Sequence, residues 1–332
     1  MEKVVHYMRW QWIVASAILI AVLTDLRIMS SGQFFSIELP NKLQDLLTLT
    51  FSIIIESMPF VLLGIFLAVI IRIWVPAKAL QSWLPKYGIL RRLYISLMGV
   101  LLPVCECGNL PLARGLIARG FTPAESLTFL LAAPILNPIT LITTHQAFGG
   151  DIHILLARAF GALLIANLIG WLFSKHRRPE KMLTQQFLAT CKSEGTHSHT
   201  RPDRSLTLFG KELGNLLPAL FVGALVAGLI QVLVPREVLV GLGSNPALSI
   251  LIMMLLAFIV SICSNVDAFF ALAFSNTFSV GSIVSFLVFG PMIDIKMLNL
   301  MRTTYTVPVL IQVTAVVALM SAAIGLAVNY AL

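Results

Sequence analysis

Charge is what this sequence has least of. Only 11% of its 332 residues are charged, 23 of them Lys or Arg and 15 Asp or Glu, whereas 58% are hydrophobic and the mean hydropathy is +0.91. A soluble domain usually needs about a quarter of charged residues to hydrate its surface. The composition therefore excludes a soluble enzyme, a nucleic-acid-binding module and a disordered scaffold. Repeated long apolar runs predict an all-α polytopic membrane protein, with the lipid bilayer as its first partner.

Several sequence motifs are also missing. Four cysteines at irregular spacing give no disulfide framework. The chain contains no Gly-x-x-x-x-Gly-Lys-Ser/Thr stretch, so ATP would need another subunit, and no His-Glu-x-x-His, Gly-x-Ser-x-Gly or Gly-x-Gly-Asp pattern. We therefore predict neither a cofactor nor enzymatic activity. An intramembrane enzyme stays open as an alternative, because acids and thiols near the midplane can support hydrolysis or group transfer.

Basic loops indicate how the chain is oriented. The apolar run from Trp10 to about Leu23 predicts a retained first helix, followed by an outer loop up to Asp45 and a return crossing from Leu46 to Trp74. Residues 72–92 contain basic side chains and no acid, and residues 174–212 contain eight basic against four acidic ones. Both stretches are expected in the cytoplasm by the positive-inside tendency, which also accounts for the net charge of +8.

Three apolar segments lie between these two basic stretches, at 93–119, 123–144 and 152–173. Two loops on the same side require an even number of crossings, so one segment must enter and leave on one side. The first is the best candidate, because Pro103, Gly108 and Pro111 interrupt it around a polar centre. Twelve helical residues before this interruption rise about 18 Å, which places it near the midplane. This scheme puts the C-terminus outside.

A second copy of the pattern follows about 158 residues later. Pro59, Gly64 and Pro76 recur at the same spacing as Pro218, Gly223 and Pro235, and the pattern of 121–134 recurs at 278–291. The copies start on opposite sides of the membrane, so the sequence predicts two inverted repeats with broken or re-entrant helices around Cys105 and Cys263, as in secondary transporters. The expected divisions are 1–45 (first helix and outer loop), 46–173 (first repeat), 174–209 (cytoplasmic polar loop) and 210–332 (second repeat).

Aligning the copies pairs polar residues within apolar segments: Glu56 with Asn215, Cys105 with Cys263, Asn109 with Asp267, and Asn137 with Asp294. From these pairs and their neighbours we predict a substrate-binding set of Cys105, Glu106, Cys107, Asn109, Asn137, Cys263, Asn265, Asp267 and Asp294. The predicted coupling residues, which would carry protons or compensate a cation, are Glu56, Glu106 and Asp267.

Each of these assignments has a structural alternative. Acids in apolar segments are costly and therefore functional candidates, but Glu56 or Asp294 could instead pair with an arginine such as Arg302 and only lock helices together. A free cysteine is most often a small buried residue. Two thiols flanking a carboxylate at a helix break, matched in the other copy, instead favour a soft cation or trivalent arsenic, with Cys105 and Cys107 as predicted metal ligands.

The string Pro103-Val104-Cys105-Glu106-Cys107-Gly108-Asn109-Leu110-Pro111-Leu112, with the later run from Phe129 to Pro138, resembles the predicted permease family often called YraQ-like. That family includes the organoarsenical efflux permease ArsP. The resemblance implies a permease of eight to ten helices in the bacterial cytoplasmic membrane, with Cys105 and Cys107 as substrate-contacting thiols in the arsenical branch. The Cys-Glu-Cys form is closer to a subgroup that works as one half of a two-component permease with a small membrane partner. An acid between the thiols suits a cation such as zinc better than a neutral organoarsenical.

The sequence therefore predicts a multi-pass permease or secondary transporter that moves a small solute, a soft metal ion or an arsenical-type compound, across the bacterial cytoplasmic membrane. The rival functions are an intramembrane enzyme and a non-transporting membrane subunit of a two-component complex.

Overall fold

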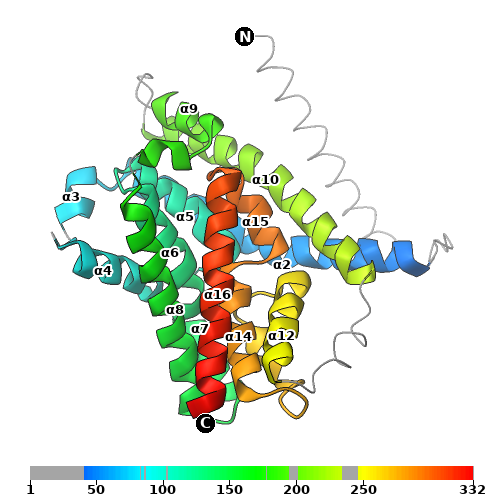
Figure 1. Cartoon of the computed structure of the whole chain (residues 1–332). Helices are drawn as coiled ribbons and strands as arrows, with labels where there is room; N and C mark the ends of the chain where they lie inside the picture. Colours follow the sequence, from blue (N-terminus) through cyan, green and yellow to red (C-terminus); the bar gives the residue numbers. More distant parts are fainter. Residues whose placement is uncertain are drawn as a thin grey trace. The chain divides into compact units, whose positions relative to one another are not determined.

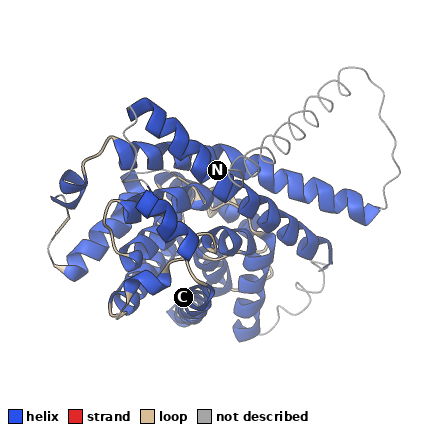
Figure 2. Cartoon of the chain, turned by 90° about the horizontal axis from the view of Figure 1, so that it is seen from above, coloured by secondary structure: helices blue, strands red, loops and turns tan. Residues whose placement is uncertain are grey.

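The computed structural model describes residues 41–82, 84–85, 87–101, 104–176, 178–193, 201–233 and 246–331. The predicted first helix at 10–23 and most of the outer loop lie outside these residues, as do Pro103 and Pro235 of the repeat pattern. Residues Leu46–Leu332 form one compact unit. Within the described residues the chain consists of helices and loops (Figure 2).

The helices of the first half of the chain begin with α2 and end with α8 (Figure 1). Their bounds are α2 Asn41–Ile73, α3 Ala77–Ser82, α4 Gly88–Leu101, α5 Glu106–Ala118, α6 Pro123–Leu136, α7 Pro138–Ala147 and α8 Ile152–Ser174. The 3-10 helix η1 (Pro179–Met182) and α9 (Gln185–Ser193) then lead to the second half, which contains α10 Arg201–Leu233, α12 Pro246–Val260, α13 Asp267–Leu272, α14 Val280–Met292, α15 Ile295–Met301 and α16 Val307–Ala331.

The two halves show the same order of elements, which supports the repeat read from the sequence. A helix of 33 residues, α2 or α10, opens each half, and a helix of 23 or 25 residues, α8 or α16, closes it. Between them lie a hairpin of short helices and a helix broken into two parts. The break falls at Asn137 between α6 and α7, and at Ile293 and Asp294 between α14 and α15.

Among the residues that the structure describes, six segments are long and apolar enough to cross a membrane: 42–73, 123–147, 152–174, 203–233, 280–301 and 307–331. A segment of 23 residues rises about 35 Å, enough for a hydrocarbon core of about 30 Å. The helices α4 and α5, with 14 and 13 residues, are too short to do so. The described residues thus form an all-α polytopic membrane protein, as predicted.

The segment at 93–119 is a re-entrant hairpin. Arg91 near the start of α4 forms an ion pair with Glu125 at the start of α6 (2.5 Å), and α6 directly follows the end of α5. The hairpin therefore enters and leaves at one end of the molecule. In the second repeat the residues at the matching positions are also in contact. There the hydroxyls of Ser249 in α12 and Ser282 in α14 lie 2.6 Å apart.

The two repeats are inverted with respect to each other. Gly161, in the first half of α8, packs against Ile324, near the end of α16, so these matched helices run antiparallel. The segment after α8 also meets the segment before α16, because Thr184 N donates to Thr304 O (2.9 Å) and Leu183 bridges Tyr305. Figure 1 shows the C-terminus of α16 at the end opposite α9. The predicted inversion is confirmed.

The described part of the polar stretch 174–209 is largely helical. It contains η1, α9 and the first residues of α10, which begins at Arg201 rather than at the expected boundary of 210. The charged residues at 203 and 204 lie on the first turns of that helix and are exposed, so a polar composition there does not prevent helix formation. The first turns of this long helix are therefore charged and exposed, ahead of its apolar part.

Candidate functional site

The hairpin turns of the two repeats meet in the protein interior. Cys105 is the residue before α5, and Cys263 lies in the link between α12 and α13. In that link Ser261 has a positive φ of 51°, a left-handed conformation that non-glycine residues adopt rarely and that often accompanies functional sites. The packing is reciprocal, since α5 contacts α15 of the other repeat and α13 contacts α7.

One cluster brings together ligand atoms from both repeats. The Sγ atoms of Cys105 and Cys263 and a carboxylate oxygen of Glu106 all lie within 4.8 Å of one another. These three residues are at most 4% exposed. Cys263 Sγ donates to Glu106 Oε2 (3.7 Å), and Ser264 donates to the same oxygen from its backbone N (3.4 Å) and its hydroxyl (3.3 Å). Two thiols and a carboxylate are a donor set for a soft cation.

Cys107 lies against α2. Its Sγ contacts the hydroxyl of Ser57 in α2 at 3.6 Å, and the group with metal-ligand spacing uses Cys263 in its place. The thiol of Cys105 nevertheless also interacts with that of Cys107. A metal site formed by Cys105 and Cys107 together stays a prediction.

Lys296 is the functional candidate that sequence reasoning missed. Its Nζ lies 3.3 Å from Glu106 Oε1 and 3.5 Å from Ser261 O, and the residue is 2% exposed. A buried lysine next to a buried carboxylate neutralises its charge, which a dry interior requires. The sequence feature that could have identified Lys296 is that it is the single lysine in the apolar run from Val288 to Leu298.

A second buried ion pair also joins the two repeats, but here the acid comes from the second repeat and the base from the first. Arg158 of α8 binds Asp267 of α13 through two contacts (2.6 and 3.0 Å) and also donates to the hydroxyl of Thr144 (2.7 Å). Both side chains are at most 3% exposed. Glu106 of the first repeat thus pairs with a base of the second, and Asp267 of the second pairs with a base of the first. Sequence reasoning also missed Arg158.

The predicted amide and acid residues at the breaks serve as helix caps. Asn137 Oδ1 accepts from Ile139 N (3.0 Å) at the start of α7, and Asp294 Oδ1 accepts from Met297 N (2.5 Å) at the start of α15. Asn137 and Asp294, which align in the two repeats, therefore both cap the start of a helix. Asp294 does not pair with Arg302, which is exposed. Asn265 is half-buried and accepts from the hydroxyl of Thr140 (3.1 Å).

Several polar atoms at these positions have no hydrogen-bond partner among the described residues. They are both side-chain atoms of Asn109, Asn137 Nδ2 and Asp294 Oδ2, all on residues at most 1% exposed. Buried polar groups are almost always satisfied by protein, water or ligand. These atoms are thus available to water or to a solute.

Glu56 lies at the margin of the buried site, within electrostatic range of Lys296 and Glu106. It is exposed on α2, and no basic side chain of the described residues forms an ion pair with it. Ser57, the next residue, contacts Cys107, so Glu56 is at the edge of the helix face that packs on the hairpin. Its predicted coupling role stays a prediction.

Buried charges close the end of the molecule where α2 ends and α10 begins. The carboxylate of Glu212 binds Arg72 (2.5 Å) and Arg114 (2.8 Å), with all three side chains about 1% exposed. Arg114 also donates to the hydroxyls of Thr303 (3.2 Å) and Thr304 (3.1 Å). Segments from both repeats are tied together here, at the end that the sequence predicts to be cytoplasmic.

Fold and site define a class: a multi-pass helical membrane protein in which two inverted repeats enclose a buried polar site between broken helices. Comparison with known proteins gives the family. Residues 42–330 match the ArsP_1 model, described as "Predicted permease", and the chain belongs to that family. No solved structure matches.

Two curated relatives cover most of the chain. The chain is 37% identical to the UPF0718 protein YcgR of Bacillus subtilis over 261 residues, which are 76% of this chain and 86% of the relative. It is 35% identical over 282 residues to a Streptococcus mutans protein named "Putative two-component membrane permease complex subunit", with 82% and 91% covered. The family supports a membrane permease, and a transporter rather than an enzyme.

Proposed function

We propose that this permease carries a thiophilic cation, or a trivalent arsenical-type compound, across the bacterial cytoplasmic membrane, and that it binds this cargo at Cys105, Glu106 and Cys263. The observation that carries the proposal is the convergence of these three ligand groups, one of them from the other repeat, in a site without solvent access. A site at the junction of inverted repeats is placed where rocking of one repeat on the other exposes it to each side in turn.

The site has its own charge compensation. Lys296 compensates the negative charge of Glu106 when no cation is bound. A cation that reaches this carboxylate must therefore displace the ammonium group of Lys296. Thiols bind soft metals as thiolates, so loading the site also releases protons. Cation movement is thereby linked to proton movement, which supports coupling to the proton gradient.

The test is transport by the purified chain in proteoliposomes against a panel of Cu(I), Ag(I), Zn(II), Cd(II) and trivalent arsenicals. For any active cargo, Cys105→Ser, Cys263→Ser and Glu106→Gln should each lower uptake at least about tenfold, the effect of losing one strong ligand contact of roughly 1.4 kcal/mol or more. Cys191→Ser is the matched control, since Cys191 lies in α9 away from the cluster. Normal transport by all three site variants would refute the site assignment.

A second candidate function is that of a subunit in a two-component membrane complex. The name of the Streptococcus mutans relative and the exposed acid in the middle of α2 support it. A partner helix with a basic residue would satisfy Glu56. If this is correct, a membrane partner should co-purify with the native chain and be lost with Glu56→Gln. If the Glu56→Gln variant still co-purified with the partner, Glu56 would be excluded as the contact.

A further inference from the structure

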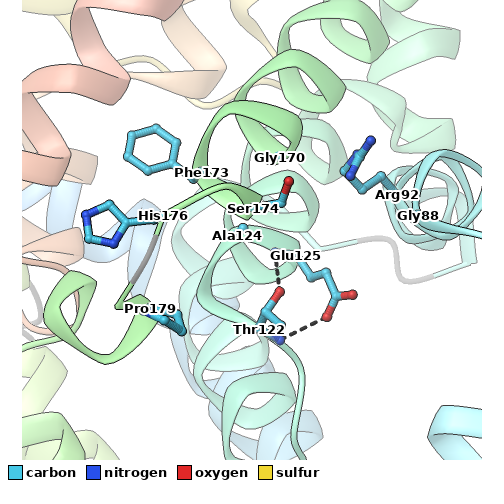
Figure 3. A pocket seen from close by; sticks show the side chains of 10 residues that line it. All are labelled: Gly88, Arg92, Thr122, Ala124, Glu125, Gly170, Phe173, Ser174, His176 and Pro179. Carbon is cyan, nitrogen blue, oxygen red and sulfur yellow. Dashed lines mark hydrogen bonds between the residues drawn. The ribbon is translucent and has the colours of Figure 1, made fainter.

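A cavity opens between the starts of α4 and α6 and the end of α8. It has a volume of about 240 Å³, and Figure 3 shows the side chains that line it. The polar part of the lining consists of Arg92, Thr122, Glu125, Ser174 and His176. This cavity is separate from the buried thiol site and takes no part in the proposed transport step.

The cavity lies at the level of the membrane–water interface. α8, an apolar span of 23 residues, ends there at Ser174. Trp171 in its last turn is 44% exposed and stacks under the Nζ of Lys175 at 4.0 Å. Tryptophan and lysine side chains gather at the headgroup level of bilayers. At the same level both helices expose apolar side chains, Ile89 at the start of α4 and Leu172 in the last turn of α8.

Arg92 is built into the cavity wall. Its stem crosses α8 at Gly170, where an added Cβ would lie only 2.9 Å from Arg92 Cδ and would overlap the hydroxyl of Thr128. The glycine therefore makes room for the arginine to pass between α4 and α8. Figure 3 shows the guanidinium of Arg92 on one side of the cavity. No acid among the described residues lies within ion-pair distance of it.

The acid that lines the cavity is already neutralised. Glu125 pairs with Arg91 at 2.5 Å and accepts from Thr122 N in the capping box of α6. Arg92 therefore leaves one uncompensated positive charge in the cavity, and Lys175 and Arg178 lie close by along the chain. A cavity of this kind, basic inside and flanked by exposed apolar side chains, complements a phosphate with acyl chains attached to it.

We infer that this cavity binds the headgroup of one anionic phospholipid, with its phosphate on Arg92 and its acyl chains along the apolar faces of α4 and α8. Arginine pairs with phosphate through two parallel hydrogen bonds. Basic pockets between membrane helices at the cytoplasmic surface recognise anionic headgroups. The lipid would join the re-entrant hairpin to α8.

The experiment titrates the detergent-solubilised full chain with phosphatidylglycerol, phosphatidylcholine or inorganic phosphate, and measures bound lipid by native mass spectrometry and the melting temperature. We expect one phosphatidylglycerol bound in preference to phosphatidylcholine, with a rise in melting temperature. Arg92→Met keeps the apolar stem and removes the charge, and should weaken phosphatidylglycerol binding at least about tenfold. Arg302→Met, at an exposed position outside the cavity, should bind as the native chain does.

Arg92→Lys keeps the charge and loses the two-point contact. It should retain a preference for phosphatidylglycerol at lower affinity, and it decides the question if Arg92→Met does not fold. Unchanged phosphatidylglycerol binding by the Arg92 variants would overturn the inference. Equal stabilisation by inorganic phosphate alone, or an equal loss with Arg302→Met, would also overturn it.

Discussion

The ion pair of Arg158 with Asp267 should hold the two repeats together. Two contacts of 2.6 and 3.0 Å join them, and the guanidinium also reaches the hydroxyl of Thr144. Both residues are at most 2% exposed. Arg158→Met leaves the carboxylate buried without its counter-charge, and breaking such a pair on one side costs about 3–5 kcal/mol. Asp267→Asn should cost a similar amount, because the guanidinium is then left uncompensated.

The double variant Arg158→Met with Asp267→Asn removes both charges. Its loss in free energy of unfolding should be smaller than the sum of the two single losses by about 2 kcal/mol or more. The free energies of unfolding would be measured by equilibrium denaturation in mixed micelles. The control is the pair Arg91 and Glu125, whose 2.5 Å contact is close to the 2.6 Å of Arg158 with Asp267 but whose side chains are 26% and 13% exposed. Its single variants should cost about 1 kcal/mol or less.

Two results would refute this reasoning. If Arg158→Met cost no more than Arg91→Met, burial would not set the strength of the pair. If the single costs at 158 and 267 added without coupling, the two side chains would act through other partners, and the pair would not connect the repeats.

Three further predictions concern packing, the closed end and topology. Gly64→Ala should destabilise the protein by about 1–3 kcal/mol, because a Cβ there overlaps the Gly108 carbonyl, whereas Gly210→Ala, with nothing within 4 Å, should be neutral or stabilise α10 by up to about 1 kcal/mol in the same denaturation assay. Glu212→Gln leaves two buried arginines without a counter-charge and should cost about 3–5 kcal/mol; retention of native stability would show that the cluster is hydrated. Reporter fusions at 190 and at the C-terminus should report opposite sides of the membrane, since α8 and α16 run antiparallel; a shared side would contradict the inverted repeat.

Much of the fold could be predicted because hydrophobic periodicity and length are local properties. Long apolar runs determine which segments span a membrane, and the spacing of prolines and glycines revealed the duplication. The interruption at 103–111 indicated a re-entrant segment because proline and glycine disfavour continuous helix there. Helix α10 begins at Arg201, ahead of the expected repeat boundary at 210, and polar composition does not show where such a solvated helix begins.

The candidate site was only partly accessible to the same reasoning. Cys105, Glu106 and Cys263 were found because they are polar residues at breaks in apolar segments. Lys296 and Arg158 were not found, because the alignment of the repeats selects residues that match, and both break the symmetry. Their importance depends on which acid each base meets across the repeat boundary.

The sequence by itself therefore determined the membrane setting, the duplication, its inverted sense and the positions where the helices break. Each follows from composition and spacing along the chain. Only the tertiary structure decided which thiols share a cluster, which base neutralises which acid, and where a cavity for a headgroup opens. The thiol cluster and the buried ion pairs of Glu106 and Asp267 depend on distances between residues more than a hundred positions apart, and a few ångströms decide whether a buried charge is compensated.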